Sequence, residues 1–404
     1  MDMPDLTRII ALKDVWGSQT DHIDVHVQRY AMLYGLPVIE NSFELPSEHL
    51  DRENDQFFTV LAIRRADDAV YLVSPPGDPY PRLPGRTLQE YEAPEDVAAD
   101  LIRIHIGLHP GGMTPIAIVK NVFYSRRGSK TRTHVGVAFD ARVAGIPNTQ
   151  HPNGYFTRQP PGELFLGNRK VLDIALQRPL REVPVGEATE HHTSTWRGRL
   201  HSYVVRPLTS PWSSHIIRRE LLSMLHSTLR ATDTMVDVAC GDDTLLLHLG
   251  RALGCNLLVG NDICWSSTRR LRDYARDNGL DVLLSNHDIG ELPFNARFDV
   301  GLVKNVLHHI PGVPEATAFL GRLREIARTL AIVEFEDPKN SRLGRNWNRY
   351  YEKWLGDGDV HLHHFLTESK LRRVVDTLPA ARAKFRRVWT IKGACLLAVV
   401  EFAS

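Results

Sequence analysis

The chain is poor in the features that mark secreted, membrane-spanning or strongly charged proteins. Its 404 residues include only four cysteines and no CxxC pair, which argues against a disulfide framework and favours reduced thiols in the cytoplasm. No apolar run is long enough to cross a membrane, and the acidic first residues lack the apolar core of a signal peptide. Lysine and arginine number 49 against 48 acidic residues, so no global attraction to nucleic acid or to a membrane surface is expected.

Length and composition indicate a globular chain with more than one domain. At 404 residues the chain is long for one domain, and its apolar fraction of 43% is ordinary for a folded protein. We therefore predict an N-terminal extension over 1–54, an α+β domain over 55–180, a linker over 181–212 and an α/β domain over 213–404.

The most informative stretch is an apolar strand followed by a turn of small residues. Residues 235–238 form the apolar run, Ala239-Cys240-Gly241 form the turn, and an apolar run of helical character begins at Leu245. Small residues in such a turn let a ligand approach the backbone closely. The pattern is typical of the first strand, turn and helix of a doubly wound α/β domain, which binds ligands at the carboxyl ends of its strands.

Acidic residues after the apolar runs indicate the chemistry of the ligand. Asp242 and Asp243 suit the dipole of the following helix but would repel a pyrophosphate, so they favour a ligand with an amino group and no phosphate. A second apolar run, 256–260, leads to Asp262, and an acid in that place can bind both ribose hydroxyls. A third run ends in Asp288.

These motifs, in this order and spacing, resemble those of class I S-adenosylmethionine-dependent methyltransferases over about residues 215–404. The resemblance implies a Rossmann-like domain with a seven-stranded sheet and S-adenosyl-L-methionine as its cofactor. It implies that the loop around Asp237 holds the methionine moiety, that Asp262 binds the ribose and that Asp288 contacts the adenine amino group. The cofactor-binding residues that it implies are Asp237, Ala239, Gly241, Asp262, Ile263, His287, Asp288, Ile289 and Asn305.

The cofactor loop departs from the pattern of that family, which commonly reads Asp-x-Gly-x-Gly-x-Gly. Ala239 stands at the first glycine position and Asp243 at the last. Alanine is common at the first position, but an aspartate restricts the backbone more than glycine does. The geometry of the loop at Asp243 is therefore left open.

Three residues are candidates for the chemical step of methyl transfer, in which an oxygen or carbon acceptor needs a base and a neutral nitrogen does not. His308 and His309 follow the fourth apolar run, 298–303, and Glu334 lies near the end of the fifth, 331–336. These are places where such sheets bind ligands. We take His308, His309 and Glu334 as candidate catalytic residues, with a purely structural role for the histidine pair as the alternative.

The segment 346–357 is rich in aromatic residues at helical spacing. Trp347, Tyr350 and Tyr351 are expected on one face of an amphipathic helix, which either packs into the core or covers the acceptor. In the segment 361–367, three histidines raise the question of a metal site, but their spacing fits poorly and we predict no metal. The candidate substrate-binding residues are Trp347, Tyr350, Tyr351 and His364, with Thr367 expected to cap the following helix.

The N-terminal half predicts a hairpin, a loop rich in proline and glycine, a helix and two further strands. The hairpin strands are expected over 57–63 and 69–73, and the helix begins at Pro94 and stops near Gly107. The later strands are expected over 114–124 and 133–141. In this order the elements resemble a Nudix domain over about 55–175, with an unrelated α+β domain as the alternative.

The Nudix resemblance fails where that family carries its chemistry. Glu92 matches the first glutamate of the family's motif, but Asp100-Leu101 replace its Arg-Glu pair and Ile104-His105 replace its Glu-Glu pair. Nudix hydrolysis depends on these carboxylates, which hold divalent cations. We therefore predict a Nudix-like fold without hydrolase activity, which serves recognition, dimerisation or pocket formation.

The leading hypothesis is methyl transfer from S-adenosylmethionine to an oxygen, nitrogen or carbon atom of a small molecule, by analogy a specialised metabolite. No membrane partner is expected, and a homodimer is among the expected assemblies. One alternative is an RNA or nucleotide methyltransferase, in which the basic segment 126–132 contacts phosphates, although the near-neutral charge weighs against nucleic acid. The other is a sensor that binds S-adenosylmethionine without turnover.

Overall fold

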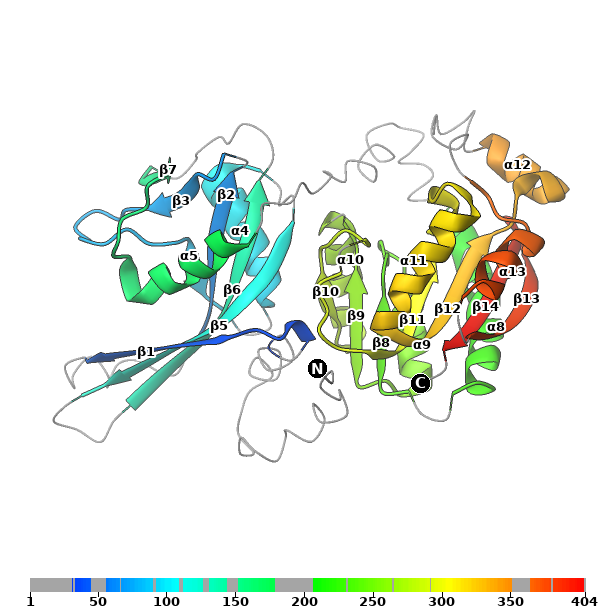
Figure 1. The fold of residues 1–404 in the computed structure, drawn as a ribbon, viewed down its shortest axis with the longest axis horizontal. Helices are drawn as coiled ribbons and strands as arrows, with labels where there is room; N and C mark the ends of the chain where they lie inside the picture. The colour runs from blue at the N-terminus through cyan, green and yellow to red at the C-terminus, as the bar shows by residue number, and fades with distance from the viewer. Residues whose placement is uncertain are drawn as a thin grey trace. The chain divides into compact units, whose positions relative to one another are not determined.

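The computed structural model describes two compact units of the chain (Figure 1). It describes residues 31, 33–44, 56–65, 67–89, 92–108, 112–125, 131–143, 152–178, 206–229, 232–263, 265–290, 292–350, 364–378 and 381–402, with the backbone alone at 206–212 and 265–266. The first unit contains the described residues up to 178 together with 286–288 and 292–296, and the second contains the others.

The N-terminal unit is built on a seven-stranded mixed sheet. Its strands are β1 (Val38–Glu44), β2 (Gln56–Arg65), β3 (Val70–Val73), β4 (Gly85–Thr87), β5 (Met113–Tyr124), β6 (Thr131–Val143) and β7 (Gly154–Thr157). Their order across the sheet is β1-β5-β6-β2-β3-β7, and β4 pairs with β2. The pairs β1–β5 and β2–β6 are parallel, and the other pairs are antiparallel.

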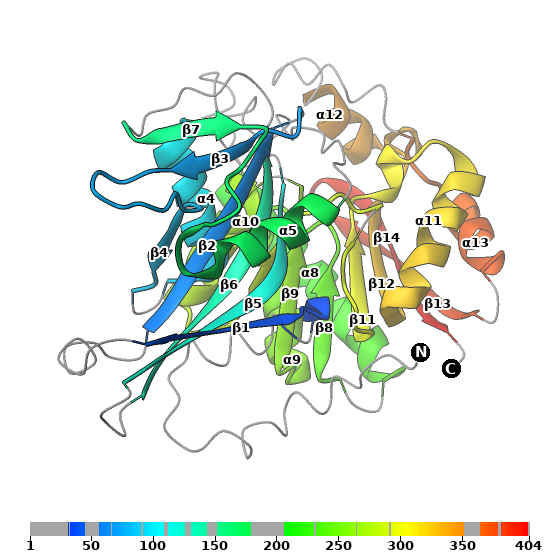
Figure 2. The same ribbon diagram turned by 60° about the vertical axis from the view of Figure 1, so that its left-hand side comes forward.

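Two helices, α4 (Pro94–Ile106) and α5 (Asn168–Gln177), cover opposite faces of this sheet (Figure 2). Neighbouring residues of β2 point to opposite faces. Thr59 donates a hydrogen bond from Oγ1 to the carbonyl of Pro94, 3.2 Å away, whereas Val60 belongs to the apolar cluster that contains Val171 and Leu172 of α5. A 3-10 turn, η2 (Phe165–Gly167), leads directly into α5.

The predicted helix at Pro94 is confirmed, together with both of its ends. Pro94 stands in the first turn with Glu95 and Asp96, where proline and acids are favoured. Gly107 ends the helix with a φ of 67° and donates its N–H to the carbonyl of Arg103. The predicted hairpin is also confirmed, because β2 and β3 pair antiparallel.

The second unit is the predicted seven-stranded, Rossmann-like α/β domain. Its strands are β8 (Thr234–Asp237), β9 (Leu257–Asn261), β10 (Leu283–Ser285), β11 (Phe298–Lys304), β12 (Ala327–Phe335), β13 (Ala381–Thr390) and β14 (Gly393–Phe402). Its helices are α8 (Arg206–His226), α9 (Leu245–Leu253), α10 (Trp265–Asp277), α11 (Gly312–Ile326), α12 (Arg342–Tyr350) and α13 (Glu368–Asp376), with the 3-10 turns η5 (Leu307–His309) and η6 (Pro338–Asn340).

The strands are arranged in the order β10-β9-β8-β11-β12-β14-β13. The direction in which the chain adds strands to the sheet therefore reverses between β8 and β11, and we call this point the reversal. The first five strands are parallel, and β14 is antiparallel to both of its neighbours. Parallel strands buried on both faces are apolar throughout, and β8 and β9 are buried along their whole length. Ligands of such sheets bind outside the carboxyl ends of the strands at the reversal.

Three boundaries differ from the expectations. The predicted linker extends to 212, but α8 already begins at Arg206, and proline at position 207 is tolerated in its first helical turn. The third strand was expected to reach Asp288, but β10 ends at Ser285. β1 was not predicted, because its polar sequence becomes a strand only through its pairing with β5. Among the described residues, no helix is long and apolar enough to span a membrane.

Gly250 in α9 and Gly321 in α11 are a matched pair for a test of helix packing. A Cβ at position 250 would lie 2.3 Å from Cδ2 of Leu258 in β9, whereas a Cβ at position 321 would meet nothing within 4 Å. We expect Gly250→Ala to lower the free energy of unfolding by about 1–3 kcal/mol through overpacking. Gly321→Ala should raise it by about 0.5–1 kcal/mol. Urea unfolding measures both, and equal effects would contradict a close fit of α9 on β9.

Candidate active site

The first carboxylate of the site, Asp237, is buried at the end of β8. The residue is 1% exposed, and its Oδ1 accepts a hydrogen bond from the N–H of Ala239 at 3.2 Å. Within the described part of the chain, its buried Oδ2 has no hydrogen-bond partner. Burial raises the pKa of Asp237 to about 8, although the nearby Lys304 opposes the shift. A buried oxygen of this kind is suited to a polar group of a ligand.

Asp243, which stands where a glycine was expected, has two partners that a glycine could not hold. Its Oδ1 accepts a hydrogen bond from the N–H of Leu245 at 2.8 Å, at the first residue of α9. Its other oxygen forms an ion pair with Nζ of Lys304 at the end of β11. The aspartate therefore holds the first N–H of α9 and connects the loop after β8 to the neighbouring strand.

The remaining loop contacts bring together Gly241 and Asp262, whose roles in cofactor binding remain predictions. Gly241 has a φ of 53°, in the left-handed region that favours glycine, and its N–H donates to Oδ2 of Asp262 at 2.8 Å. The buried Asn261 donates from Nδ2 to the carbonyl of Val238 at 3.0 Å. The loop after β8 is thus held against the end of β9.

Glu334 and His308 form a buried pair on the other side of the reversal. Glu334 in β12 is 0% exposed, and its Oε1 accepts the N–H groups of Val306 and Leu307, each at 2.6 Å. Its Oε2 lies 2.8 Å from Nδ1 of His308. Because a carboxylate can only accept, Nδ1 of His308 carries the proton in this contact. Glu334 therefore fixes both the turn η5 and the tautomer of His308.

The other candidates near this turn lie around the His308 ring. The ring of His308 stacks on Phe365 with centroids 5.6 Å apart, and the exposed His309 is its neighbour at 4.1 Å. The exposed His364 donates its backbone N–H to the carbonyl of His308 at 2.6 Å.

Asn305 has a φ of 55° directly after β11. The expectation of Thr367 as a helix cap is confirmed, because its Oγ1 accepts the N–H of Lys370.

The aromatic helix α12 packs on the turn between β13 and β14. A Cβ at Gly393 would lie 3.2 Å from the Cα of Gly344 in α12, so the two backbones approach closely. The rings of Trp347 and Tyr350 lie 5.3 Å apart, and Nζ of Lys392 lies 5.6 Å from the Trp347 ring centroid. The expected helix continues to 357, but Tyr351 and the residues after it lie outside the described residues.

Residues 286–288 belong to the N-terminal unit by their contacts. Asn286 forms an isolated bridge with Met113, and Nε2 of His287 lies 2.7 Å from Oγ1 of Thr114. The expected roles of His287, Asp288 and Ile289 at the cofactor remain predictions.

A metal centre was not predicted. Within the described ranges, no three histidine, cysteine or acidic side chains gather in a way that could hold a metal ion. His361 and His363 lie outside these ranges.

Comparisons with known proteins show that this chain is similar to methyltransferases. The family model described as a methyltransferase domain matches residues 235–331. An uncharacterized methyltransferase of Mycobacterium bovis is 31% identical over 151 residues, which are 37% of this chain and 72% of the relative. The ubiquinone/menaquinone biosynthesis C-methyltransferase of Bdellovibrio bacteriovorus is 22% identical over 142 residues, 35% of this chain and 60% of the relative.

Solved structures of methyltransferases also align with this chain. The plantazolicin methyltransferase in complex with SAH is 12% identical, with a TM-score of 0.42, and the alignment covers 53% of this chain and 93% of the other. The magnesium protoporphyrin IX methyltransferase of Synechocystis PCC 6803 with bound SAH is 16% identical, with a TM-score of 0.39, 54% of this chain and 96% of the other.

The sheet and its strand-end carboxylates therefore define a Rossmann-like methyltransferase. The chain belongs to the S-adenosylmethionine-dependent methyltransferase family, and S-adenosyl-L-methionine is its cofactor. The residues present fit this cofactor. The buried Oδ2 of Asp237, which has no partner among the described residues, can accept from an amino group, and Gly241 leaves the turn without a side chain. Sequence reasoning missed Lys304 and Asn261 as parts of the site, although each ends an apolar strand that pairs with β8.

Binding of S-adenosylhomocysteine should release a proton from Asp237. Because its pKa is raised to about 8, the carboxyl is mostly protonated at pH 6–7, whereas a cationic amino group favours the carboxylate. Affinity should therefore rise with pH, by at most about tenfold per unit, and level off above the pKa.

Calorimetry between pH 6 and 9, in buffers of different ionisation enthalpy, measures both the affinity and the proton release. Asp237→Asn removes the titrating group and should abolish the slope. A slope that persists in this variant would assign the proton to another group.

Proposed function

We propose that the second unit transfers the methyl group to an oxygen, nitrogen or carbon atom of a small molecule, and that His308 takes the proton of the acceptor. S-adenosylmethionine supplies a methyl group bound to a sulfonium sulfur. The residues of the chain align the acceptor and receive its proton. The observation that carries this proposal is the buried contact between His308 and Glu334 at the carboxyl end of β12.

The pairing orients His308 for proton transfer. Since Nδ1 donates to Glu334, the basic lone pair of the neutral ring is on Nε2. When Nε2 takes a proton, the ring becomes a cation beside the Glu334 carboxylate, which stabilises it. The hydrogen bonds from Val306 and Leu307 keep the carboxylate in place during this change.

Glu334 is a positioning residue in this proposal, not the direct catalyst that the sequence suggested. It is 0% exposed and both of its oxygens are occupied by the turn, so it acts through His308. We assign no proton transfer to the exposed His309. Trp347, Tyr350 and His364 are proposed to line the path of the acceptor.

A small-molecule acceptor, by analogy a specialised metabolite, is favoured over RNA. One relative is named as a C-methyltransferase of ubiquinone and menaquinone biosynthesis. The basic segment 126–132 carries the RNA alternative, but residues 126–130 lie outside the described residues.

Replacement of His308 should remove catalysis while leaving cofactor binding intact. With an acceptor found by screening phenols, amines and carbon acids against methyl-labelled cofactor, His308→Ala should lower kcat by about 10²–10⁴. Glu334→Gln should lower kcat less and shift the pH profile, because the ring loses its charged partner. His226→Ala, at the exposed end of α8, is the matched control. Full activity of His308→Ala would refute the base.

We further propose that the N-terminal unit is Nudix-like and does not hydrolyse diphosphates. Arg86 binds Glu92 through two hydrogen bonds of 2.6 and 2.7 Å and lowers the pKa of that carboxyl. On α4, Leu101 is buried and Ile104 is 52% exposed, and neither can bind a metal.

Glu92→Gln should therefore leave methyl transfer unchanged. The full-length protein, incubated with ADP-ribose and Mg²⁺, should release no AMP above the background of a protein-free sample. Release of AMP by the native chain that is lost in Glu92→Gln would show that hydrolysis has been retained.

A further inference from the structure

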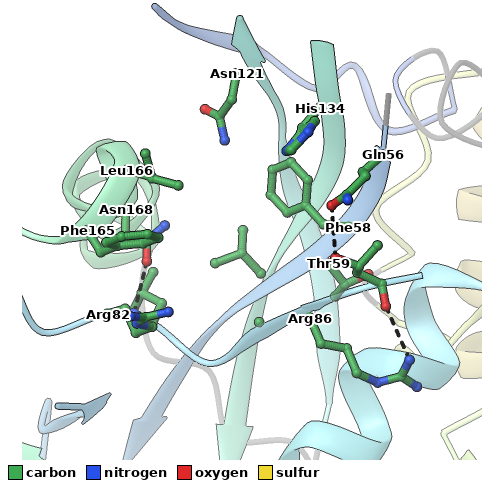
Figure 3. A pocket seen from close by; sticks show the side chains of 14 residues that line it. Gln56, Phe58, Thr59, Arg82, Arg86, Asn121, His134, Phe165, Leu166 and Asn168 are labelled. Carbon is green, nitrogen blue, oxygen red and sulfur yellow. Dashed lines mark hydrogen bonds between the residues drawn. The ribbon is translucent and has the colours of Figure 1, made fainter. Parts of the chain in front are cut away.

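The N-terminal unit contains a pocket of about 170 Å³ on the face of its sheet that carries α5 (Figure 3). Phe165, Leu166 and Asn168 lie on one side of it, and residues of β2 and β6 lie on the other. A protein cavity of about 150 Å³ is large enough to bind benzene. The pocket therefore has room for about one aromatic ring, and because it is open to solvent, a second fused ring can extend from its mouth.

A row of polar side chains crosses the sheet at one end of this pocket. Asn41, Asn121, His134 and Gln56 are register partners in the adjacent strands β1, β5, β6 and β2. Register partners point to the same face of a sheet. Of these four residues, the last three line the pocket.

The orientation of the Asn121 amide is determined by a chain of hydrogen bonds that begins at a lysine. Nζ of Lys170 donates to Oδ1 of Asn41 at 3.0 Å, and a lysine cannot accept. Asn41 must therefore turn its Nδ2 toward Asn121, where it donates to Oδ1 at 2.9 Å. The Nδ2 of Asn121 remains, and Figure 3 shows it directed toward the gap between the two walls. Asn121 is 5% exposed, so little of its side chain reaches bulk water.

The walls of the pocket are aromatic and closely supported. A Cβ at Gly136 would lie 2.7 Å from Cδ2 of Phe58, so the absence of a side chain there allows the Phe58 ring to lie against β6. On the opposite wall, the Arg82 guanidinium lies 4.2 Å from the centroid of Phe165. Leu166 has a φ of 43°, in the left-handed region that is unfavourable for a residue with a side chain. These surfaces favour a flat ring.

The charges at the rim are paired, which disfavours an anionic ligand. Arg82 forms an ion pair with Asp78, and Arg86 forms one with Glu92. Nε of Arg82 is buried and, among the described residues, has no hydrogen-bond partner. Because this N–H is buried, it is not offered to the pocket, whereas the Asn121 amide presents a donor there, so a matching ligand must supply an acceptor.

We propose that this pocket binds an uncharged, planar compound of one or two rings that presents a carbonyl oxygen or ring nitrogen to Asn121. The pocket shares no residue with the methyl-transfer site and does not depend on the assignment of that site.

Two probes of similar size test this requirement in the full-length protein. Quinolin-2-one has two fused rings and a carbonyl acceptor, whereas indole has two fused rings and no acceptor beyond its π face. We expect quinolin-2-one to bind at least tenfold more tightly in ligand-observed NMR titrations, because indole leaves the buried donor unpaired. Saturating S-adenosylhomocysteine in every sample keeps the probes from the cofactor site.

Asn121→Asp tests most directly whether the ligand accepts a hydrogen bond from residue 121. Its carboxylate can still accept from Asn41 but presents an acceptor to the pocket, so binding of quinolin-2-one should weaken at least tenfold. The matched control is Asn278→Asp at an exposed site after α10, which should bind as the native protein does. Thermal unfolding reports whether each variant folds, and Phe58→Leu serves if Asn121→Asp does not, with an expected loss of about three- to tenfold for both probes.

Three results would overturn the proposal. The first is equal affinity for the two probes, and the second is unchanged quinolin-2-one binding in both pocket variants. The third is displacement of quinolin-2-one by inorganic diphosphate, which would make the paired arginines an anion site instead.

Discussion

The second unit depends on one carboxylate that water does not reach. Glu334 accepts two backbone N–H groups and the Nδ1 proton of His308, so a single side chain of β12 shapes the turn that follows β11. Burial of a carboxylate is costly unless every oxygen is hydrogen-bonded, and here the turn supplies these bonds. The turn η5 and the strand β12 therefore stabilise each other, and together they determine the orientation of the His308 ring.

A hydrogen-bonded and ion-paired acid also holds the cofactor loop in place. Family members commonly use glycine at the last position of this loop, whereas Asp243 accepts the first N–H of α9 and pairs with Lys304 of the adjacent strand. The loop gains rigidity from these bonds in place of glycine's freedom. Asp237 is different, since its buried Oδ2 has no hydrogen-bond partner among the described residues and its pKa is raised. One acid of the loop serves the fold and another is available to the ligand.

Local signals in the sequence predicted the parts of the fold that local physics decides. Helix α4 could be placed because Pro94 and Gly107 mark its ends, and Thr367 marked the start of α13. The end of β10 and the existence of β1 could not be placed, since pairing with distant strands decides them. Asp237 was predicted from the family resemblance of its loop, and Asp262 was predicted because it follows an apolar run. The pairing of Asp243 with Lys304 joins residues 61 positions apart, and no local pattern reveals it.

The amide chain in the N-terminal unit gives a surface residue control over what a buried site can recognise. Lys170 is exposed and does not line the pocket, yet its inability to accept a hydrogen bond determines which way Asn41 and Asn121 face. An asparagine amide has nearly the same shape in both orientations, so without the lysine the two amides could rotate together by half a turn at little steric cost. The polarity seen by a ligand would then invert from donor to acceptor. Neutralisation of one solvent-facing charge would in this way change the selectivity of the pocket without changing its shape.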